Sequence, residues 1–276
     1  MEEAARLFSH PAFGAALVRL GGNLLAISEA NRSCARAIGQ HRRYGVAALV
    51  VYFDGRFRSG LGPAPTRAML TGLAQRAGLG TRRGIGAILD VLLHFGFVCE
   101  AALPDARSRR LVPAAPLTDY LTAGLAARLD AAALLGPLPS AAGQPDRILP
   151  VYLDQLVAPL LAENRMPRQA FPELAPFADR VAGYMLLFHL LALSEQAPPG
   201  APVAIRVGDL ARRLHVSRMQ VAKILAAAAR AGLWTTHAGP AIIWNPEIHH
   251  RLRLFAAVEL ARATCAAQAC IAESPA

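Results

Sequence analysis

Apolar residues recur at intervals of three or four positions along most of the chain, which is the periodicity of amphipathic α-helices. This pattern predicts helices at 12–40, 44–53, 66–77, 81–95, 116–134, 147–164, 176–195, 207–214, 217–231 and 246–271. Strand-like segments form only two pairs, FVCEAAL with RLV and LWTTH with AIIW, and each pair predicts a β-hairpin. The expected fold class is therefore mainly α with small β-hairpins.

The chain contains an internal repeat with a spacing of 136 residues. TRRGIGAILDVLLHFGFV (81–98) aligns without a gap on SRMQVAKILAAAARAGLW (217–234). Thr81 and Ser217 take the same place, and both are good N-caps for the apolar helices that follow. The residues just upstream also match once one turn residue is omitted. Each copy therefore predicts a helix, a tight turn, a capped helix and a hairpin, and two copies imply two similar domains.

Glycines at 78, 80 and 84 have a spacing close to that of a dinucleotide-binding loop. Such a loop requires an apolar β-strand immediately before its first glycine. The preceding segment, PTRAMLTGLAQRA, has helical spacing instead, and the second copy has LHVS without any glycine. The glycines are therefore expected to form a turn between two helices, where glycine takes a left-handed conformation at little cost.

The length of 276 residues suits two domains. GPLPSAAGQPD (136–146) is the clearest linker because it is rich in Pro, Gly and Ser. We expect a first domain at 1–140, which includes N-terminal helices, and a second domain at 141–276 with flanking helices.

The formal net charge is +10, with +7 in residues 1–140 and +3 in residues 141–276. This excess predicts an anionic partner, with nucleic acid first and an anionic membrane second. The first thirty residues lack a continuous apolar core, and the most apolar run, 181–193, is too short to cross a bilayer. We therefore expect a cytoplasmic protein without a membrane partner.

The sequence offers little support for an enzyme. It contains no HExxH, GxSxG or P-loop pattern, and no catalytic residue, metal or cofactor is expected. The four cysteines lack CxxC spacing, which favours reduced thiols over a zinc site. Cys99 lies in a predicted strand and is expected to be buried, with a redox-sensing role as the alternative.

The segment DLARRLHVSRMQVAKILAAAARAGLW resembles the helix-turn-helix of winged-helix transcription factors. The first copy, with its hairpin and the following PLTDYL, resembles the MarR-type version. The resemblance covers roughly 65–135 and 200–260, and it implies two tandem winged helix-turn-helix domains in one chain. It also implies that the protein is a transcriptional regulator that binds double-stranded DNA, with helices 81–95 and 217–231 in the major groove.

The resemblance also implies which residues contact DNA. In the first copy these are Thr81, Arg82 and Arg83; in the second they are Ser217, Arg218, Gln220 and Lys223; in the first wing they are Arg107, Arg109 and Arg110. Arginine can bind guanine and glutamine can bind adenine through two hydrogen bonds, and a capped helix N-terminus suits a phosphate. Each residue also has a plain alternative, because the caps stabilise helices without DNA and arginines are common on solvated surfaces and loops.

Gly84 and Gly86 leave two alternatives open, because each costs about 1 kcal/mol relative to Ala inside a helix. They either permit a close approach to DNA or mark a first copy that has shifted towards packing. The aromatic-rich segment 147–195 is likewise either core or the lining of a pocket for a small-molecule effector, and no ligand class follows from its residues.

Many winged-helix regulators are homodimers with two recognition helices about one DNA turn apart. One chain carries both here, so we expect a pseudo-dimer in which helices 12–40 and 246–271 help to join the halves, with a further true homodimer as an option. The alternative function is a tandem winged-helix protein-interaction scaffold without DNA binding. The salt dependence of DNA binding distinguishes the two.

Overall fold

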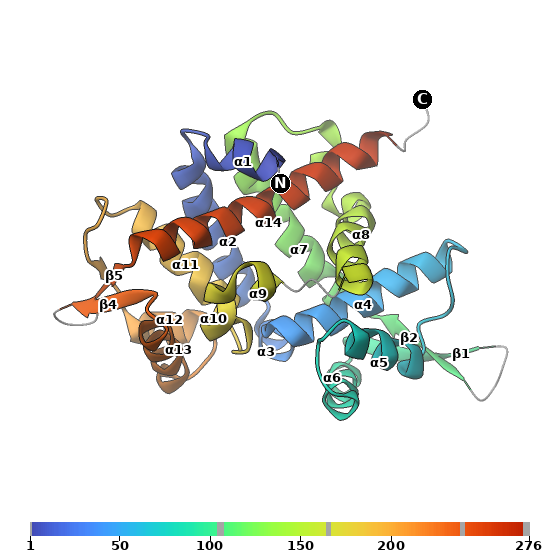
Figure 1. Ribbon diagram of the computed structural model, residues 1–276. Helices are drawn as coiled ribbons and strands as arrows, with labels where there is room; N and C mark the ends of the chain where they lie inside the picture. The colour runs from blue at the N-terminus through green and yellow to red at the C-terminus, as the bar shows by residue number, and fades with distance from the viewer. Residues whose placement is uncertain (1, 104–107, 164–166, 238–240, 273–276) are drawn as a thin grey trace.

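The computed structural model describes residues 2–103, 108–163, 167–237 and 241–272, and it is mainly helical with two small antiparallel sheets (Figure 1). The helices of the first part of the chain are α1 (Glu2–Phe8), α2 (Phe13–Ala30), α3 (Arg32–Ile38), α4 (His41–Arg58), α5 (Arg67–Arg76), α6 (Arg82–His94) and α7 (Ala115–Ala132). Those of the second part are α8 (Pro145–Glu163), α9 (Pro167–Ala170), α10 (Ala175–Ala178), α11 (Gly183–Glu195), α12 (Val207–Arg213), α13 (Arg218–Arg230) and α14 (Pro246–Ala272). The strands are β1 (Val98–Ala102), β2 (Arg109–Pro113), β3 (Val203–Ala204), β4 (Trp234–His237) and β5 (Ala241–Trp244).

Two helices that the periodicity predicts as continuous are broken in the structure. The segment 12–40 divides at Asn31 into α2 and α3, and the segment 176–195 divides into α10 and α11. Ala182, just before α11, is left-handed with φ 62°, and its N–H donates a 2.9 Å hydrogen bond to the carbonyl of Gly39. The second break therefore depends on a contact with a distant part of the chain.

The predicted N-caps are confirmed. The Thr81 hydroxyl accepts a hydrogen bond of 3.2 Å from the N–H of Gly84, and the Ser217 hydroxyl accepts one of 3.1 Å from the N–H of Gln220. Each bond satisfies one of the N–H groups that a helix start leaves free. Thr81 and Ser217 thus begin α6 and α13 at equivalent positions of the sequence repeat.

The turn before each capped helix also has the expected geometry. Gly78 is left-handed with φ 68°, and His215 takes the same role in the second copy with φ 53°. The helix α5 ends at Arg76 and Ala77 is its C-cap, so a helix and not a β-strand precedes Gly78. The segment therefore lacks the strand that a dinucleotide-binding loop requires. Only the backbone conformation is common to both turns, because the second copy has histidine where the first has glycine.

The two halves have the same order of elements around these helices. In the first, α4 is followed by Thr66, which forms an isolated bridge to Arg110, and then by α5, α6, β1, β2 and α7. In the second, α11 is followed by β3, α12, α13, β4, β5 and α14, and the sheet order is β3-β5-β4. The pattern of alternation did not predict β3, because a strand of two residues is too short to show a period.

The hydrophobic residues form two cores that cross the sequence halves. One core contains residues of α1, α2, α11, α12, α13 and the second sheet. The other contains residues of α3, α4, α5, α6, the first hairpin and α8. Helices α7 and α14 contribute to both cores, so they connect the halves. The domain boundary near residue 140, which the sequence repeat suggests, stays a prediction.

Among the described residues, α14 is long and apolar enough to cross a membrane by length and composition. If each of two sharply bent helix pairs is counted as one span, the number of candidate spans in these residues rises to three. In the structure 56% of the most apolar window of α14 is buried, and this helix packs against α1, α7 and α8. The expected absence of a membrane partner stays a prediction.

His249, near the start of α14, makes stability depend on pH. Its Nε2 lies 2.8 Å from the Ser194 hydroxyl of α11. Burial, the charge of Arg253 and the neighbouring His250 lower the pKa of His249 from its ordinary 6.5 to about 4. The unfolded chain therefore binds this proton at a higher pH than the folded chain, and stability should fall as the pH drops from about 6.5 towards 4.

His249→Gln should flatten part of this loss of stability, measured as the thermal unfolding midpoint between pH 7 and 4.5. His94→Gln, at the exposed end of α6, is the matched control and should leave the profile unchanged. An unaltered pH profile in His249→Gln would contradict the assignment. His189, whose pKa burial also lowers, accounts for a remaining slope of the same sign.

Candidate nucleic-acid interface

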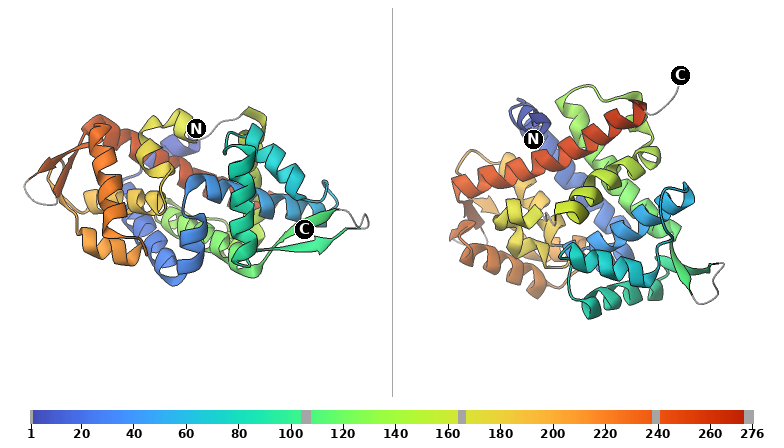
Figure 2. Two further views of the ribbon diagram at one scale, coloured as in Figure 1. Left: turned by 90° about the horizontal axis from the view of Figure 1, so that it is seen from below. Right: turned by 45° about the vertical axis from the view of Figure 1, so that its right-hand side comes forward.

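The capped helices α6 and α13 lie on the same side of the molecule. Figure 1 places both along the lower edge, and the view from below in Figure 2 shows both lying across the face turned towards the viewer. The hairpins β1–β2 and β4–β5 project at opposite ends of this face. Two capped helices therefore share one face of the molecule, with a hairpin at each end of it.

Each capped helix buries one side and exposes its N-terminal turn. The buried residues are Ile85, Leu89 and Leu92 in α6, and Val221, Ile224 and Ala228 in α13, while Ile88 and Leu225 are partly buried. The outward residues Thr81, Arg82, Arg83, Ser217, Arg218 and Lys223 are exposed, and Gln220 is half-buried. The apolar residues thus hold both helices in place while their first turns face the solvent.

The charges at these helix starts oppose the helix dipole. The first turns of α6 and α13 contain arginines and no acidic residue. The partial positive charge at a helix N-terminus disfavours a cation there by roughly 0.3–1 kcal/mol. Within the described part of the chain, Arg82, Arg83, Arg218 and Lys223 also have no ion pair or side-chain hydrogen bond. Unpaired cations placed against the local stability rules indicate a functional surface.

The surrounding segments are basic as well. Residues 66–94 contain four arginines and one acidic residue, whereas residues 206–232 contain five arginines, one lysine and one acidic residue. The second capped helix therefore lies in the more basic segment, although the first half of the chain has the larger net charge. Several first-half arginines form intramolecular ion pairs instead, such as Arg19 with Asp130 at 3.2 Å.

The structure revises the expected wing contacts. Arg107 lies outside the described residues. Arg109 is exposed at the start of β2, 3.7 Å from a carboxylate oxygen of Glu100. The sequence predicted that Arg110 contacts DNA from the tip of the wing. In the structure it lies within the hairpin instead, where it pairs with Ala101, and its guanidinium lies 4.8 Å from the centre of the Phe57 ring.

Asp54 provides the physical reason for the position of Arg110. Its carboxylate is almost fully buried and lies 3.8 Å from the Arg110 guanidinium and 2.9 Å from that of Arg58. A buried carboxylate needs such partners. Arg110 therefore anchors the hairpin to α4, and it is removed from the proposed DNA contacts.

The sequence interpretation missed Met219, which lies between Arg218 and Gln220 in the first turn of α13. Its side chain is 63% exposed, among the most exposed large apolar side chains in the described chain. The signal was present in the repeat, because Met219 aligns with Arg83. The exposed first turn of α13 therefore has the apolar Met219 where that of α6 has the cationic Arg83.

Cys99 also differs from expectation. It was expected to be buried in its strand, but it is exposed in β1. Only Val98 is buried in β1, so the rest of this strand projects from the core and leaves Cys99 accessible.

Gly86 allows the two interpretations of the α6 glycines to be separated. A Cβ there would meet only the Arg67 guanidinium at 3.6 Å, an ordinary contact. Gly86→Ala should therefore stabilise the fold by about 1 kcal/mol. If the glycine permits close approach to DNA, the added methyl group should also weaken DNA binding by about five-fold, measured by fluorescence anisotropy.

Gly22→Ala is the matched control, because Gly22 is exposed in the interior of α2 and a Cβ there meets nothing within 4 Å. It should give a similar gain in stability without a change in DNA affinity. Equal DNA affinity for both variants would assign Gly86 to packing instead.

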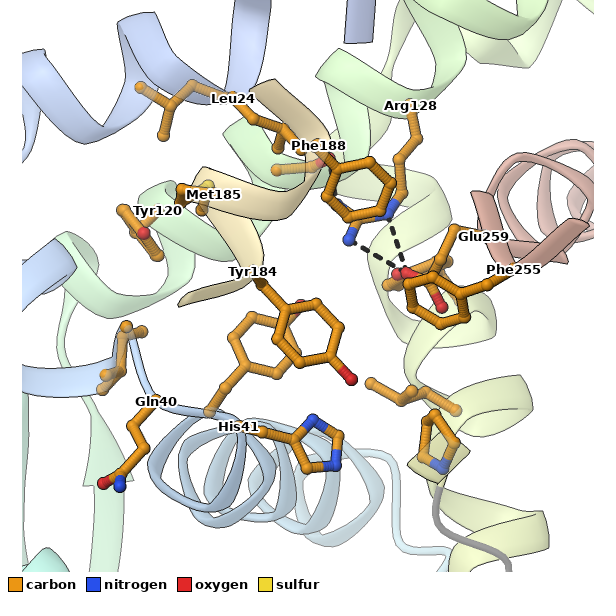
Figure 3. Close-up of a pocket in the computed structure, with 18 residues that line it drawn as sticks. Leu24, Gln40, His41, Tyr120, Arg128, Tyr184, Met185, Phe188, Phe255 and Glu259 are labelled. Carbon is orange, nitrogen blue, oxygen red and sulfur yellow. Dashed lines mark hydrogen bonds and ion pairs between the residues drawn. The ribbon is translucent and has the colours of Figure 1, made fainter. Parts of the chain in front are cut away.

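A cavity of about 90 Å³ lies between the two halves (Figure 3). Helices α2, α4, α7, α8, α11 and α14 all contribute to its lining. Of the aromatic-rich segment, Tyr152, Tyr184, Met185 and Phe188 line the cavity. Phe171 and Phe177 pack in the core instead. The segment therefore contributes both to the core and to the lining of a cavity, while an effector stays a prediction.

The polar groups that line this cavity are a buried ion pair, tyrosine hydroxyls and the side chains of Gln40 and His41. Arg128 of α7 donates hydrogen bonds of 3.0 and 3.2 Å to one carboxylate oxygen of Glu259 of α14. The pKa of Glu259 is lowered by the cations Arg262 and Arg128, which outweigh its burial. Within the described residues the buried hydroxyls of Tyr120 and Tyr184 have no hydrogen-bond partner, and burial raises the pKa of both.

Comparison of the chain with known protein families, with curated proteins and with solved structures finds no match. The chemistry and placement of the two exposed helix starts are the features of the molecule that bear on its function. Among the described residues, no group of three or more His, Cys, Asp or Glu side chains is close enough together to hold a metal ion.

Proposed function

We propose that this protein is a sequence-specific DNA-binding transcriptional regulator with two tandem winged-helix units in one chain. In this proposal α6 and α13 are the recognition helices, and each enters the major groove with its N-terminal turn. The base-contacting residues are Arg82 and Arg83 in α6, and Arg218 and Gln220 in α13. Thr81, Ser217 and Lys223 contact phosphates, and Arg109 of the first wing contacts the DNA backbone.

One observation carries the proposal: two capped helices expose unpaired cations on one face of the molecule, between two outward hairpins. Neither feature is needed for folding, because the apolar sides of α6 and α13 already anchor them. The common element order of the two halves supports the same interpretation, since helix, strand, helix, helix and hairpin is the order of a winged helix-turn-helix.

The test is the affinity for mixed genomic DNA fragments at several salt concentrations. A protein that neutralises several phosphates loses affinity log-linearly with salt, with a slope of about −0.9 per phosphate contact. The two cations proposed to contact the DNA backbone, Lys223 and Arg109, predict a slope of roughly −2. A protein-interaction scaffold without DNA contacts should show no binding at moderate salt, and that result would reject the proposal.

The cavity favours a second feature of this function, which is control by a small molecule. It lies between the halves that carry α6 and α13, so a ligand there can change their relative position. Its apolar lining and the unpartnered Tyr120 hydroxyl fit a small apolar ring with one hydrogen-bonding group. We expect p-cresol to raise the unfolding temperature more than toluene does, and Tyr120→Phe to remove the difference. Equal effects of the two probes on the unmodified protein would reject this ligand class.

The chain is proposed to act as a pseudo-dimer, since one polypeptide supplies both recognition helices. Helices α2 and α14 join the halves, because α2 packs on α11 and α14 packs on α7 and α8. Analytical ultracentrifugation of the DNA complex measures the stoichiometry and distinguishes one bound chain from a further homodimer.

A further inference from the structure

The two capped helices present different side chains at equivalent positions of the repeat. In order along the first two turns, the outward pairs are Arg82 and Arg218, Arg83 and Met219, Gly84 and Gln220, and Ala87 and Lys223. Only the first pair is the same residue. The other three pairs differ in charge, hydrogen-bonding capacity or size.

These differences correspond to different base edges. Arg82 and Arg83 each suit the two acceptors of guanine. In α13, Arg218 suits guanine, the exposed Met219 side chain suits the methyl group of thymine, and Gln220 suits the donor and acceptor of adenine. The first helix therefore favours G·C pairs, whereas the second favours A·T pairs beside a G·C pair.

The register of the hairpins shows which residues of α7 and α14 are equivalent. The N–H of Ala114 donates to the carbonyl of Phe97 at 2.9 Å, and the N–H of Asn245 donates to that of Leu233 at 2.9 Å. Phe97 and Leu233 are 136 residues apart and so are equivalent in the repeat. Positions in α14 therefore follow those in α7 by 131 residues.

This register makes Arg128 equivalent to Glu259, and these two residues bind each other between the halves. Two identical halves would place two arginines or two glutamates at this point, where like charges would be buried together. The opposite charges show that the halves have become complementary and are no longer interchangeable.

The first wing also has the longer tip. Six residues, 103–108, separate β1 from β2, whereas three residues, 238–240, separate β4 from β5. The longer tip contains Asp105 and Arg107, and Arg109 follows it. The two copies therefore also differ in the length of chain that separates their paired strands.

From these differences we infer that the DNA site is not palindromic. Resting on the proposed function, this inference assigns a G·C-rich half-site to α6 and a half-site with adjacent A·T pairs to α13, about one helical turn apart. A homodimer reads a palindrome because its two recognition helices are identical. One chain with two unlike helices has no such constraint.

The test begins with selection of duplexes from a random library by the full chain, followed by sequencing. The selected site and the two palindromes made from its halves are then compared by fluorescence anisotropy. Each mismatched base pair typically costs about 5- to 150-fold in affinity, so the selected site should bind at least ten-fold more tightly than either palindrome. Enrichment of a palindrome, or of a single half-site, would overturn the inference but leave DNA binding intact.

Two reciprocal variants assign the half-sites to the helices. Met219→Arg should replace an A·T preference by G·C in the second half-site alone, and Arg83→Met should weaken a G·C preference in the first alone. Both side chains are exposed, so each variant should fold, and thermal unfolding is the check. Unchanged preferences in both variants would overturn the assignment. Failure to enrich any duplex at low salt would reject the proposed function itself.

Discussion

Replacing Arg82 and Arg218 together with alanine should abolish specific DNA binding and leave the unfolding temperature almost unchanged. Each arginine that binds a guanine through two hydrogen bonds contributes about 1–3 kcal/mol of discrimination, so the loss should be roughly 30- to 20,000-fold. Stability should stay within about 0.5 kcal/mol, because both side chains are exposed and unpaired. Their removal also relieves an unfavourable interaction with the helix dipole.

The control removes the same charge from another part of the surface. Arg6→Ala with Arg147→Ala takes two arginines from α1 and the start of α8, away from α6 and α13 (Figure 1). This pair should weaken DNA binding only through the loss of net charge, by less than about ten-fold. If both double variants lose the same affinity, the attraction is general and the groove assignment is wrong.

The largest effect on stability is expected at the buried ion pair. Glu259 and Arg128 are about one tenth exposed, and Arg262, which also pairs with Glu259, is one fifth exposed. Glu259→Gln leaves two buried cations without their carboxylate, which should cost about 3–5 kcal/mol. For a chain of this size the unfolding temperature should fall by roughly 6–20 °C.

Glu29→Gln is the comparison, because the Glu29 pair with Arg213 is about 40% exposed on both sides. An exposed pair contributes less than about 1 kcal/mol, so this variant should melt within a few degrees of the unmodified protein. Similar unfolding temperatures for Glu259→Gln and Glu29→Gln would show that the pair between the halves is not a major source of stability.

The sequence predicted α5, α6, α12 and α13 closely because local signals agree there. Helical periodicity, the Thr81 and Ser217 caps and a left-handed turn residue all lie within a few positions of one another. The outward residues of α6 and α13 followed from the same periodicity. These residues are exposed except for Gln220, which is half-buried, while their contact with DNA stays a prediction.

Long-range contacts account for what the sequence did not show. The break at Ala182 depends on a hydrogen bond to Gly39, and the position of Arg110 depends on the buried Asp54 of α4. Arg128 and Glu259 are 131 residues apart, and no local pattern relates them. The cavity likewise exists only after α7, α11 and α14 meet, so its lining could be suspected from the aromatic residues but not located.

The most direct test of the account is protection of guanine N7 from methylation, because this atom lies in the major groove where the recognition helices are proposed to bind. The account predicts two clusters of protected guanines, about 10 base pairs apart on one duplex. Arg82→Ala should remove one cluster, and Arg218→Ala should remove the other. Guanines that stay equally protected in both variants, or a complete lack of protection in a bound duplex, would contradict the placement of α6 and α13 in the major groove.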